Sequence, residues 1–183
     1  MHSDPFFYSK EQRLMHRQWE KFEEWLKANK RAVLADLNPP ADVAAVRDLQ
    51  GKLRVVLPDD FIGCLKIHNG QRGEAEPLFG AHAFLPSRRV LMSWSTWNDL
   101  LEGGDFDGQE ARPDGTVKPV WWSAGWIPFA SNGGGDYLCL DMDPPTQGKM
   151  GQIIRVYHDV ADRIVIAPGF GPWFDRFVNE KCS

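Results

Sequence analysis

The sequence predicts an α+β fold in which a mostly antiparallel sheet of about four to six strands packs against several helices. Helical spacing of apolar residues dominates roughly the first 100 positions, whereas short apolar runs separated by turn residues fill 126–167. Helices that precede strands, rather than alternating with them, are typical of α+β proteins. We expect the helices to cover one face of the sheet.

The length and composition favour a single domain over 1–183, with an N-terminal helical extension at about 1–35. A chain of 183 residues can bury a core without disulfides or metals. Its eight Trp and eleven Phe predict an aromatic-rich core, and we place Trp126 and Trp173 inside it.

Capping and turn residues mark the helices of the first half. A capping-box pair begins a helix over about 10–29. Asn38, followed by Pro, predicts the N-cap of a second helix, which Gly51 ends. A third helix over about 58–69 begins with acidic residues, which suit the positive end of the helix dipole.

Shorter elements and a long loop follow. A strand over 81–85 precedes a helix from Ser87 to about 101, although Arg88 and Arg89 in its first turn oppose the helix dipole. Residues 102–119 carry several acids and turn formers, and predict a long mobile loop. Four strands and a closing helix are predicted at about 126–130, 136–142, 151–158, 163–167 and 170–177.

The charge and the cysteine content narrow the choice of partners and compartment. A formal net charge of −4 gives no general attraction to nucleic acid or to an anionic membrane, so we expect neither as a partner. Three widely spaced cysteines form neither a zinc pattern nor an even disulfide set. No signal sequence and no apolar run of about 20 residues is visible. We expect a cytoplasmic protein without a cofactor or a bound metal.

The Gly-rich segment after the first long strand is a candidate contact site. Asn132, Gly133 and Gly134 enter a strand, whereas phosphate-binding loops enter a helix, so a hairpin turn is the better interpretation. Such a turn presents bare backbone, which is free to contact a partner.

Acidic residues around the next strand raise the question of a metal. Asp141 and Asp143 lie on the same side of a strand end and, with Asp136, offer oxygen ligands to a metal-dependent enzyme. Because hard cations usually take six or more oxygens, turn formation before the following prolines explains this pair better.

Two further pairs resemble catalytic groups. His158 and Asp159 are adjacent, and adjacent strand residues point to opposite faces, so they do not meet unless the strand has ended. Cys64 and His68 lie one helical turn apart, which is the spacing of an activated thiol. A plain buried thiol is the better interpretation, since free Cys is among the most buried residue types.

An exposed Trp and the acidic loop are the remaining candidates. Trp121 and Trp122 are consecutive and cannot both enter one core, so we expect at least one to be exposed and available to a partner. Asp105 and Asp107 belong to the acidic loop, which would attract a basic protein face. A solvated tether without a binding role is the alternative for this loop.

Several short motifs share an order and a spacing over about 40–180. They are Leu57-Pro58, His68-Asn69-Gly70-Gln71, Trp126-Ile127-Pro128, Gly135-Asp136-Tyr137, Leu140-Asp141 and Gly151-Gln152-Ile153-Ile154, followed by the aromatic helix at 170–177. In this order they resemble the SUKH superfamily, in particular domains of the yeast cell-wall assembly regulator type. The resemblance implies an α+β binding module that is not an enzyme.

The resemblance predicts a non-enzymatic protein-binding module, in the first place an immunity protein that neutralises a cognate toxin domain. One alternative is an intracellular regulatory or scaffold protein. Another is a metal-dependent enzyme that uses Asp136, Asp141 and Asp143. The candidate partner-binding residues are Trp121, Trp122, Asn132, Gly133, Gly134, Asp136, Asp141, Asp143, Asp105 and Asp107.

Overall fold

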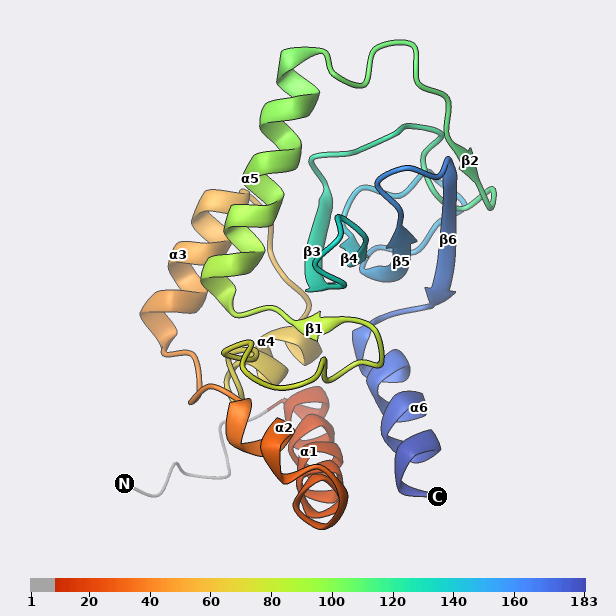
Figure 1. Cartoon of the computed structure of the whole chain (residues 1–183). Helices are drawn as coiled ribbons and strands as arrows, with labels where there is room; N and C mark the ends of the chain where they lie inside the picture. The colour runs from red at the N-terminus through yellow and green to blue at the C-terminus, as the bar shows by residue number, and fades with distance from the viewer. Residues whose placement is uncertain (1–8) are drawn as a thin grey trace.

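The structure is a computed structural model that describes residues 9–183 and confirms the α+β class (Figure 1). The strands are β1 Ala83–Phe84, β2 Arg112–Pro113, β3 Trp126–Ser131, β4 Tyr137–Asp141, β5 Gln152–Val156 and β6 Asp162–Ala167. They form one six-stranded sheet in the order β1-β3-β4-β5-β6-β2. The pairing of β2 with β6 is parallel, and the other neighbouring strands are antiparallel.

The helices are α1 Lys10–Asn29, α2 Arg31–Asp36, α3 Val43–Leu53, α4 Asp59–Leu65, α5 Ser87–Gly103 and α6 Phe170–Cys182. In Figure 1, α1, α4 and α6 gather below the sheet, whereas α3 and α5 lie side by side along its flank. Within residues 9–183, no helix combines the length and the apolar character needed to cross a bilayer.

The main core lies between the sheet and the lower helices. The predicted capping box begins α1, since Ser9 Oγ accepts from the Gln12 amide at 3.2 Å and Gln12 Oε1 accepts from the Ser9 amide at 3.3 Å. One face of α1 then enters the core through Met15, Trp19, Phe22 and Leu26. The ring of Trp173 packs edge-on against Phe129 of β3 at 5.1 Å between centroids, which joins α6 to the sheet.

A second apolar cluster covers the other face of the sheet. Side chains alternate along β4, so Leu138 and Leu140 enter the main core while Cys139 faces the second cluster. This cluster contains Trp97 of α5 and Trp122, whose rings lie 5.0 Å apart. The prediction that one face alone is covered is therefore wrong, because aromatic residues from α5 and from the segment before β3 bury the second face.

The start of α3 differs from the prediction. Asp42, rather than Asn38, is the N-cap, and its Oδ1 accepts from the Ala45 amide at 2.7 Å. The Asn38 amide donates to the Gly70 carbonyl at 2.8 Å, so it is held by a tertiary contact instead. The helix also runs past Gly51 and ends at Leu53.

The acidic loop is attached to the body of the protein at three points. Phe106 stacks on Trp97 with 5.4 Å between ring centroids. Arg112–Pro113 joins the sheet as β2, and Asp114 Oδ2 accepts from the Val165 amide at 2.9 Å. The segment predicted as a mobile loop is therefore anchored along its length.

Candidate partner-binding site

The Gly-rich segment forms the turn between β3 and β4, and the side chains of Asn132 and Ser131 hold its conformation. Asn132 Oδ1 accepts from the amides of Gly134 and Asp136 at 2.8 and 3.0 Å, and its Nδ2 donates to Asp136 Oδ2 at 2.8 Å. Gly133 has φ +78, which favours glycine. Asn132, Gly133 and Gly134 are all exposed, so this turn does present backbone to solvent.

His158 lies beside this turn, because β5 and β4 are paired in antiparallel register. Its Nδ1–H donates to Asp136 Oδ1 at 2.8 Å, and Asp159 Oδ1 lies 3.7 Å from the same nitrogen. His158 and Asp159 do meet, since β5 ends at Val156 and the chain turns. We call the group Asn132, Gly133, Gly134, Asp136, His158 and Asp159 the turn-end cluster.

Protonation at the turn-end cluster follows from these hydrogen bonds. The bond to Asp136 raises the pKa of His158 above its usual value, with a smaller contribution from the Asp159 charge. Burial opposes the ionisation of Asp136, but the hydrogen bonds from His158 outweigh burial and lower the pKa of this carboxyl. The pair therefore favours an imidazolium beside a carboxylate in mildly acidic solution.

Among residues 9–183, the same three titratable side chains form the group whose ligand atoms lie close enough to hold a metal ion. Ligand atoms of Asp136, His158 and Asp159 lie within 4.8 Å of one another, and a zinc site can use three protein ligands. His158 Nδ1 already donates to Asp136, so a metal would have to replace that hydrogen bond. A hydrogen-bonded surface group describes the geometry more directly.

Asp141 and Asp143 lie at the opposite end of β4 from Asp136. Five residues of extended chain separate Asp136 from Asp141, which corresponds to about 16 Å. The three acids predicted to form a metal-dependent active site therefore do not converge. This geometry contradicts the alternative of an enzyme built on them.

Asp141 is fully buried and cannot contact a partner, so its prediction as a binding residue is wrong. Its two carboxylate oxygens accept from Gln152 Nε2 at 2.9 Å and from the Asp143 amide at 3.1 Å. Burial raises the pKa of Asp141, although these hydrogen bonds oppose the shift. Asp143 accepts from Ser123 Oγ at 2.9 Å and pairs with Lys118. Both acids thus shape the turn, as their spacing before two prolines indicates.

The two consecutive tryptophans are divided between core and surface. Trp122 is 2 % exposed, and its Nε1 donates to Asn98 Oδ1 at 2.9 Å, so its prediction as a partner-binding residue is wrong. Trp121 is half-buried and lies under the Arg163 guanidinium, 4.8 Å from the ring centroid. One ring of the pair is accessible, as expected, and it is Trp121.

Asp105 and Asp107 of the acidic loop are exposed and lie just beyond the C-terminus of α5. Cys64 and His68, by contrast, are structural. Cys64 accepts from Trp19 Nε1 at 3.4 Å, and burial raises the pKa of its thiol far above the usual value. Both ring nitrogens of His68 have other partners, since Nε2 lies 2.6 Å from Glu23 Oε1 and Nδ1 lies 3.1 Å from the Asn38 carbonyl. This arrangement confirms the plain buried thiol.

The sequence interpretation missed a buried polar pair, Asp36 and Gln71. Gln71 Nε2 donates to Asp36 Oδ2 at 3.0 Å, and Asp36 also accepts from the amides of Gly73 and Glu74. Burial opposes the ionisation of Asp36, but these hydrogen bonds outweigh it and lower its pKa. Gln71 was visible in the sequence only as the last residue of a motif, and nothing marked Asp36.

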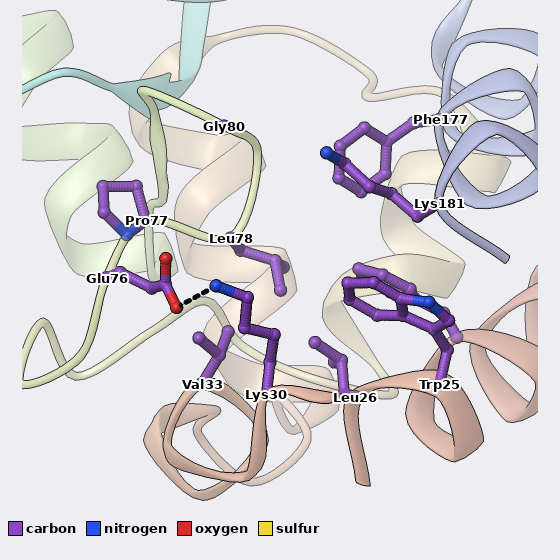
Figure 2. Close-up of a pocket in the computed structure, with 11 residues that line it drawn as sticks. Trp25, Leu26, Lys30, Val33, Glu76, Pro77, Leu78, Gly80, Phe177 and Lys181 are labelled. Atoms are coloured by element: carbon purple, nitrogen blue, oxygen red, sulfur yellow. Dashed lines mark hydrogen bonds and ion pairs between the residues drawn. The ribbon is translucent and has the colours of Figure 1, made fainter. Parts of the chain in front are cut away.

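A small hollow lies between α1, α2, α6 and the loop at 76–80 (Figure 2). Lys30 reaches across its mouth to Glu76 at 2.7 Å, and Lys181 lies over the ring of Phe177. Its volume is about 110 Å³. Ligand pockets usually enclose roughly 300–1,000 Å³, so this hollow is too small for a typical small-molecule ligand.

The structure is an α+β protein with exposed polar groups on loops at the ends of its strands. Of the three acids predicted to bind a metal, Asp136 lies apart from Asp141 and Asp143. Comparison with known families gives the class a name. The family model described as the SMI1 / KNR4 family (SUKH-1) matches residues 40–176, about three quarters of the chain. The chain belongs to this family, which confirms the resemblance drawn from its motifs.

Named relatives come from fungi. The cell wall biosynthesis/cell cycle regulator smi1 of Schizosaccharomyces pombe is 29 % identical over 163 residues, covering 81 % of this chain and 32 % of the relative. The glucan synthesis regulatory protein of Neurospora crassa is 22 % identical, covering 90 % of this chain and 38 % of the relative. The cell wall assembly regulator SMI1 of Saccharomyces cerevisiae is 22 % identical, covering 88 % and 39 %. The chain spans between about a third and two fifths of the length of these relatives.

Proposed function

We propose that this chain is a non-enzymatic, protein-binding regulatory module that acts in the cytoplasm. The observation that carries the proposal is family membership over most of the chain, together with the regulator names of the relatives. Residues 1–183 would form one SUKH-like domain, and α1, which lies within the predicted N-terminal extension, packs into its core.

The chemistry of the surface supports binding over catalysis. Asp141 and Asp143 are engaged in internal hydrogen bonds, and about 16 Å of strand separates Asp141 from Asp136. The Cys64 thiol is buried and its raised pKa disfavours the thiolate that a nucleophile requires. The regulator names favour the regulatory alternative over neutralisation of a toxin.

The turn-end cluster is the proposed contact site. Asn132, Gly133 and Gly134 are exposed with their amides satisfied inside the turn, which gives a partner a rigid surface, and Asp136 with His158 adds a charged pair next to them. Hydrogen-bonding loops held on a rigid sheet are the usual location of binding residues. Trp121, half-exposed beside Arg163, would supply an aromatic contact.

Affinity capture from cells of the source organism tests the proposal. Tagged wild type is compared with Asp136→Asn/His158→Asn, and with Asp48→Asn/Lys52→Gln as a control that removes an exposed ion pair from α3. We expect a reproducible protein partner whose recovery falls several-fold with the first variant only. Absence of any partner above a tag-only sample contradicts the function. Equal recovery with all three proteins contradicts the site, and a toxic domain as partner would restore the immunity interpretation.

The acidic loop would act on the rate of association. Its five acids are Glu102, Asp105, Asp107, Glu110 and Asp114. Replacing them with amides should slow association with a basic partner several-fold and leave dissociation nearly unchanged, since exposed charges act through steering. Trp121→Ala should instead speed dissociation. Stopped-flow rates measured against ionic strength decide the point, and an association rate indifferent to salt and to the five changes would remove the loop from the mechanism.

A further inference from the structure

A positively charged groove lies where three segments of the chain meet, near residues 38–40, 69–72 and 86–89. Its volume is about 480 Å³, and three arginines line it: Arg72, Arg88 and Arg89. The other lining residues are amides and prolines, namely Asn38, Asn69, Gln71, Pro39, Pro40 and Pro86. The lining contains no carboxylate, although the chain as a whole has a net charge of −4. The groove is therefore a local cationic site on an acidic protein.

The floor of the groove is held rigidly. Gly70 has φ +70, and a Cβ at this position would lie 2.2 Å from the backbone nitrogen of Pro86, so glycine allows the two segments to pass this closely. Asn69 Oδ1 accepts from the Ser87 amide at 2.8 Å, and Asn38 Nδ2 donates to the Asn69 carbonyl at 3.0 Å. These bonds tie all three segments together, so the groove is organised before any ligand arrives.

Two of the arginines lining the groove, Arg88 and Arg89, have no ion-pair partner within residues 9–183. Arg88 and Arg89 occupy the first turn of α5, where each opposes the helix dipole. Arg88 also borders a hollow that contains Asp48, but this carboxylate pairs with Lys52 at 2.8 Å.

Arg72 is the anchored member of the three. Its Nη2 donates to the Ala35 carbonyl, and its Nε lies 3.9 Å from Asp36 and 4.0 Å from Glu74. Because these two acids partly neutralise the charge of Arg72, Arg88 and Arg89 supply most of the positive potential in the groove. About half of the Arg72 side chain is still exposed, at 48 %, and it lines the groove together with Arg88 and Arg89.

We propose that this groove binds a phosphorylated serine or threonine segment of a protein partner. The inference rests on the proposed protein-binding function and names the chemistry of one contact. A phosphate carries nearly two negative charges and three acceptor oxygens, which suit several guanidinium forks approaching from two segments. A single carboxylate has one charge and two oxygens, and one arginine would satisfy it. The volume is within the usual range for ligand sites, roughly 300–1,000 Å³.

Fluorescence anisotropy with three labelled pools of degenerate peptides tests the proposal. The pools carry phosphothreonine, Glu or Thr at a fixed central position. Wild type is compared with Arg88→Gln/Arg89→Gln, and with Arg17→Gln/Lys27→Gln, which removes the same charge from exposed positions of α1. Thermal melts accompany each titration. The groove variant should be at least as stable as wild type, because it removes two positive charges from the positive end of the α5 dipole.

We expect wild type and the α1 control to bind the phosphothreonine pool about ten-fold or more tightly than either other pool, with the preference lost in the groove variant. Equal binding of the Glu pool, or an unchanged preference in the groove variant, overturns the proposal. Binding to vesicles of phosphatidylcholine with a phosphatidylinositol bisphosphate, without binding to the phosphothreonine pool, overturns it as well.

The two proposals can fail separately. If cellular capture yields a partner while no pool shows a phosphate preference, the groove proposal is wrong and the protein-binding function stands. If the phosphate preference depends on Arg88 and Arg89 while capture yields no partner, the regulatory function is contradicted and the groove chemistry stands.

Discussion

Replacing Gln71 with Met should destabilise the protein far more than its side-chain volume suggests, because the change removes four hydrogen bonds and nearly preserves the shape. Gln71 is 3 % exposed. Its Oε1 accepts from the amides of Leu78 and Phe84 at 2.8 and 3.1 Å. Its Nε2 donates to Asp36 Oδ2 and to the Glu76 carbonyl, both at 3.0 Å. The side chain thus joins α2, the loop at 76–80 and β1.

The magnitude follows from the two buried amides that Met would leave without an acceptor. Each unsatisfied buried donor costs about 1–3 kcal/mol, so the free energy of unfolding should fall by about 2–6 kcal/mol. Such a loss is a large part of the stability of a typical domain, about 5–15 kcal/mol. Urea denaturation measures it, and hydrogen exchange should show faster opening of the Leu78 and Phe84 amides.

A matched control separates this effect from the general cost of losing a glutamine. Gln109 lies exposed on the acidic loop and donates to the Asp105 carbonyl at 3.0 Å, so Gln109→Met should change stability by less than about 0.5 kcal/mol. A loss below about 1 kcal/mol for Gln71→Met, with an unchanged denaturant slope, would refute the assignment of these amides to Gln71.

Four further predictions concern the core, a close approach, protonation and metal dependence. Trp126→Ala should cost about 3–5 kcal/mol in urea denaturation, since this ring is fully buried; a melt like wild type would contradict that placement. Gly70→Ala should be severely destabilising, whereas Gly133→Ala, with φ +78 but open space around it, should cost only about 1–2 kcal/mol; equal costs would argue against the close approach. The free energy of unfolding should be higher for wild type than for His158→Asn, with the whole difference present below the usual histidine pKa of 6.5 and lost as the pH rises through the raised pKa of His158. In acid the difference should also shrink as Asp136, whose pKa is lowered, becomes protonated. A difference that does not depend on pH would contradict the ion pair between His158 and Asp136. Chelators should leave the melting temperature unchanged, and a drop of many degrees would show that a metal stabilises the native state.

The predictable part of the fold was encoded locally. The capping box and the spacing of Met15, Trp19, Phe22 and Leu26 depend on neighbours along one helix, and α1 follows the prediction closely. The central strands are short apolar runs between turn residues, which a single segment reveals, but whether one or both faces are covered depends on distant residues. The six-residue α2 has no side-chain cap and no long apolar period, and its Val33 is buried only through contacts with the rest of the core. Tertiary packing, which a local pattern does not contain, determines such an element.

The candidate site was predicted less well, because burial depends on what covers a residue. Asp141 and Asp143 looked equivalent in sequence, yet one is buried under Gln152 and the other is half-exposed. Trp121 and Trp122 differ in the same way, because only Trp122 is buried, where its Nε1 donates to Asn98 of α5. The turn at Asn132 was predictable because its hydrogen bonds lie within five residues of one another.

Three arginines occupy unfavourable positions in this protein, and they differ in whether the fold compensates their charge. Arg163 is fully buried, and its guanidinium donates to the carbonyls of Trp121, Val160 and Asp162 at 2.7 to 3.1 Å. Burial lowers its pKa to about 10, and these carbonyls satisfy the charge within the fold. Arg88 and Arg89 also violate a local preference, yet no internal group of the described chain pairs with them. Both are exposed, and a local conflict without internal compensation is a feature of functional sites, in agreement with the anion proposed for this groove.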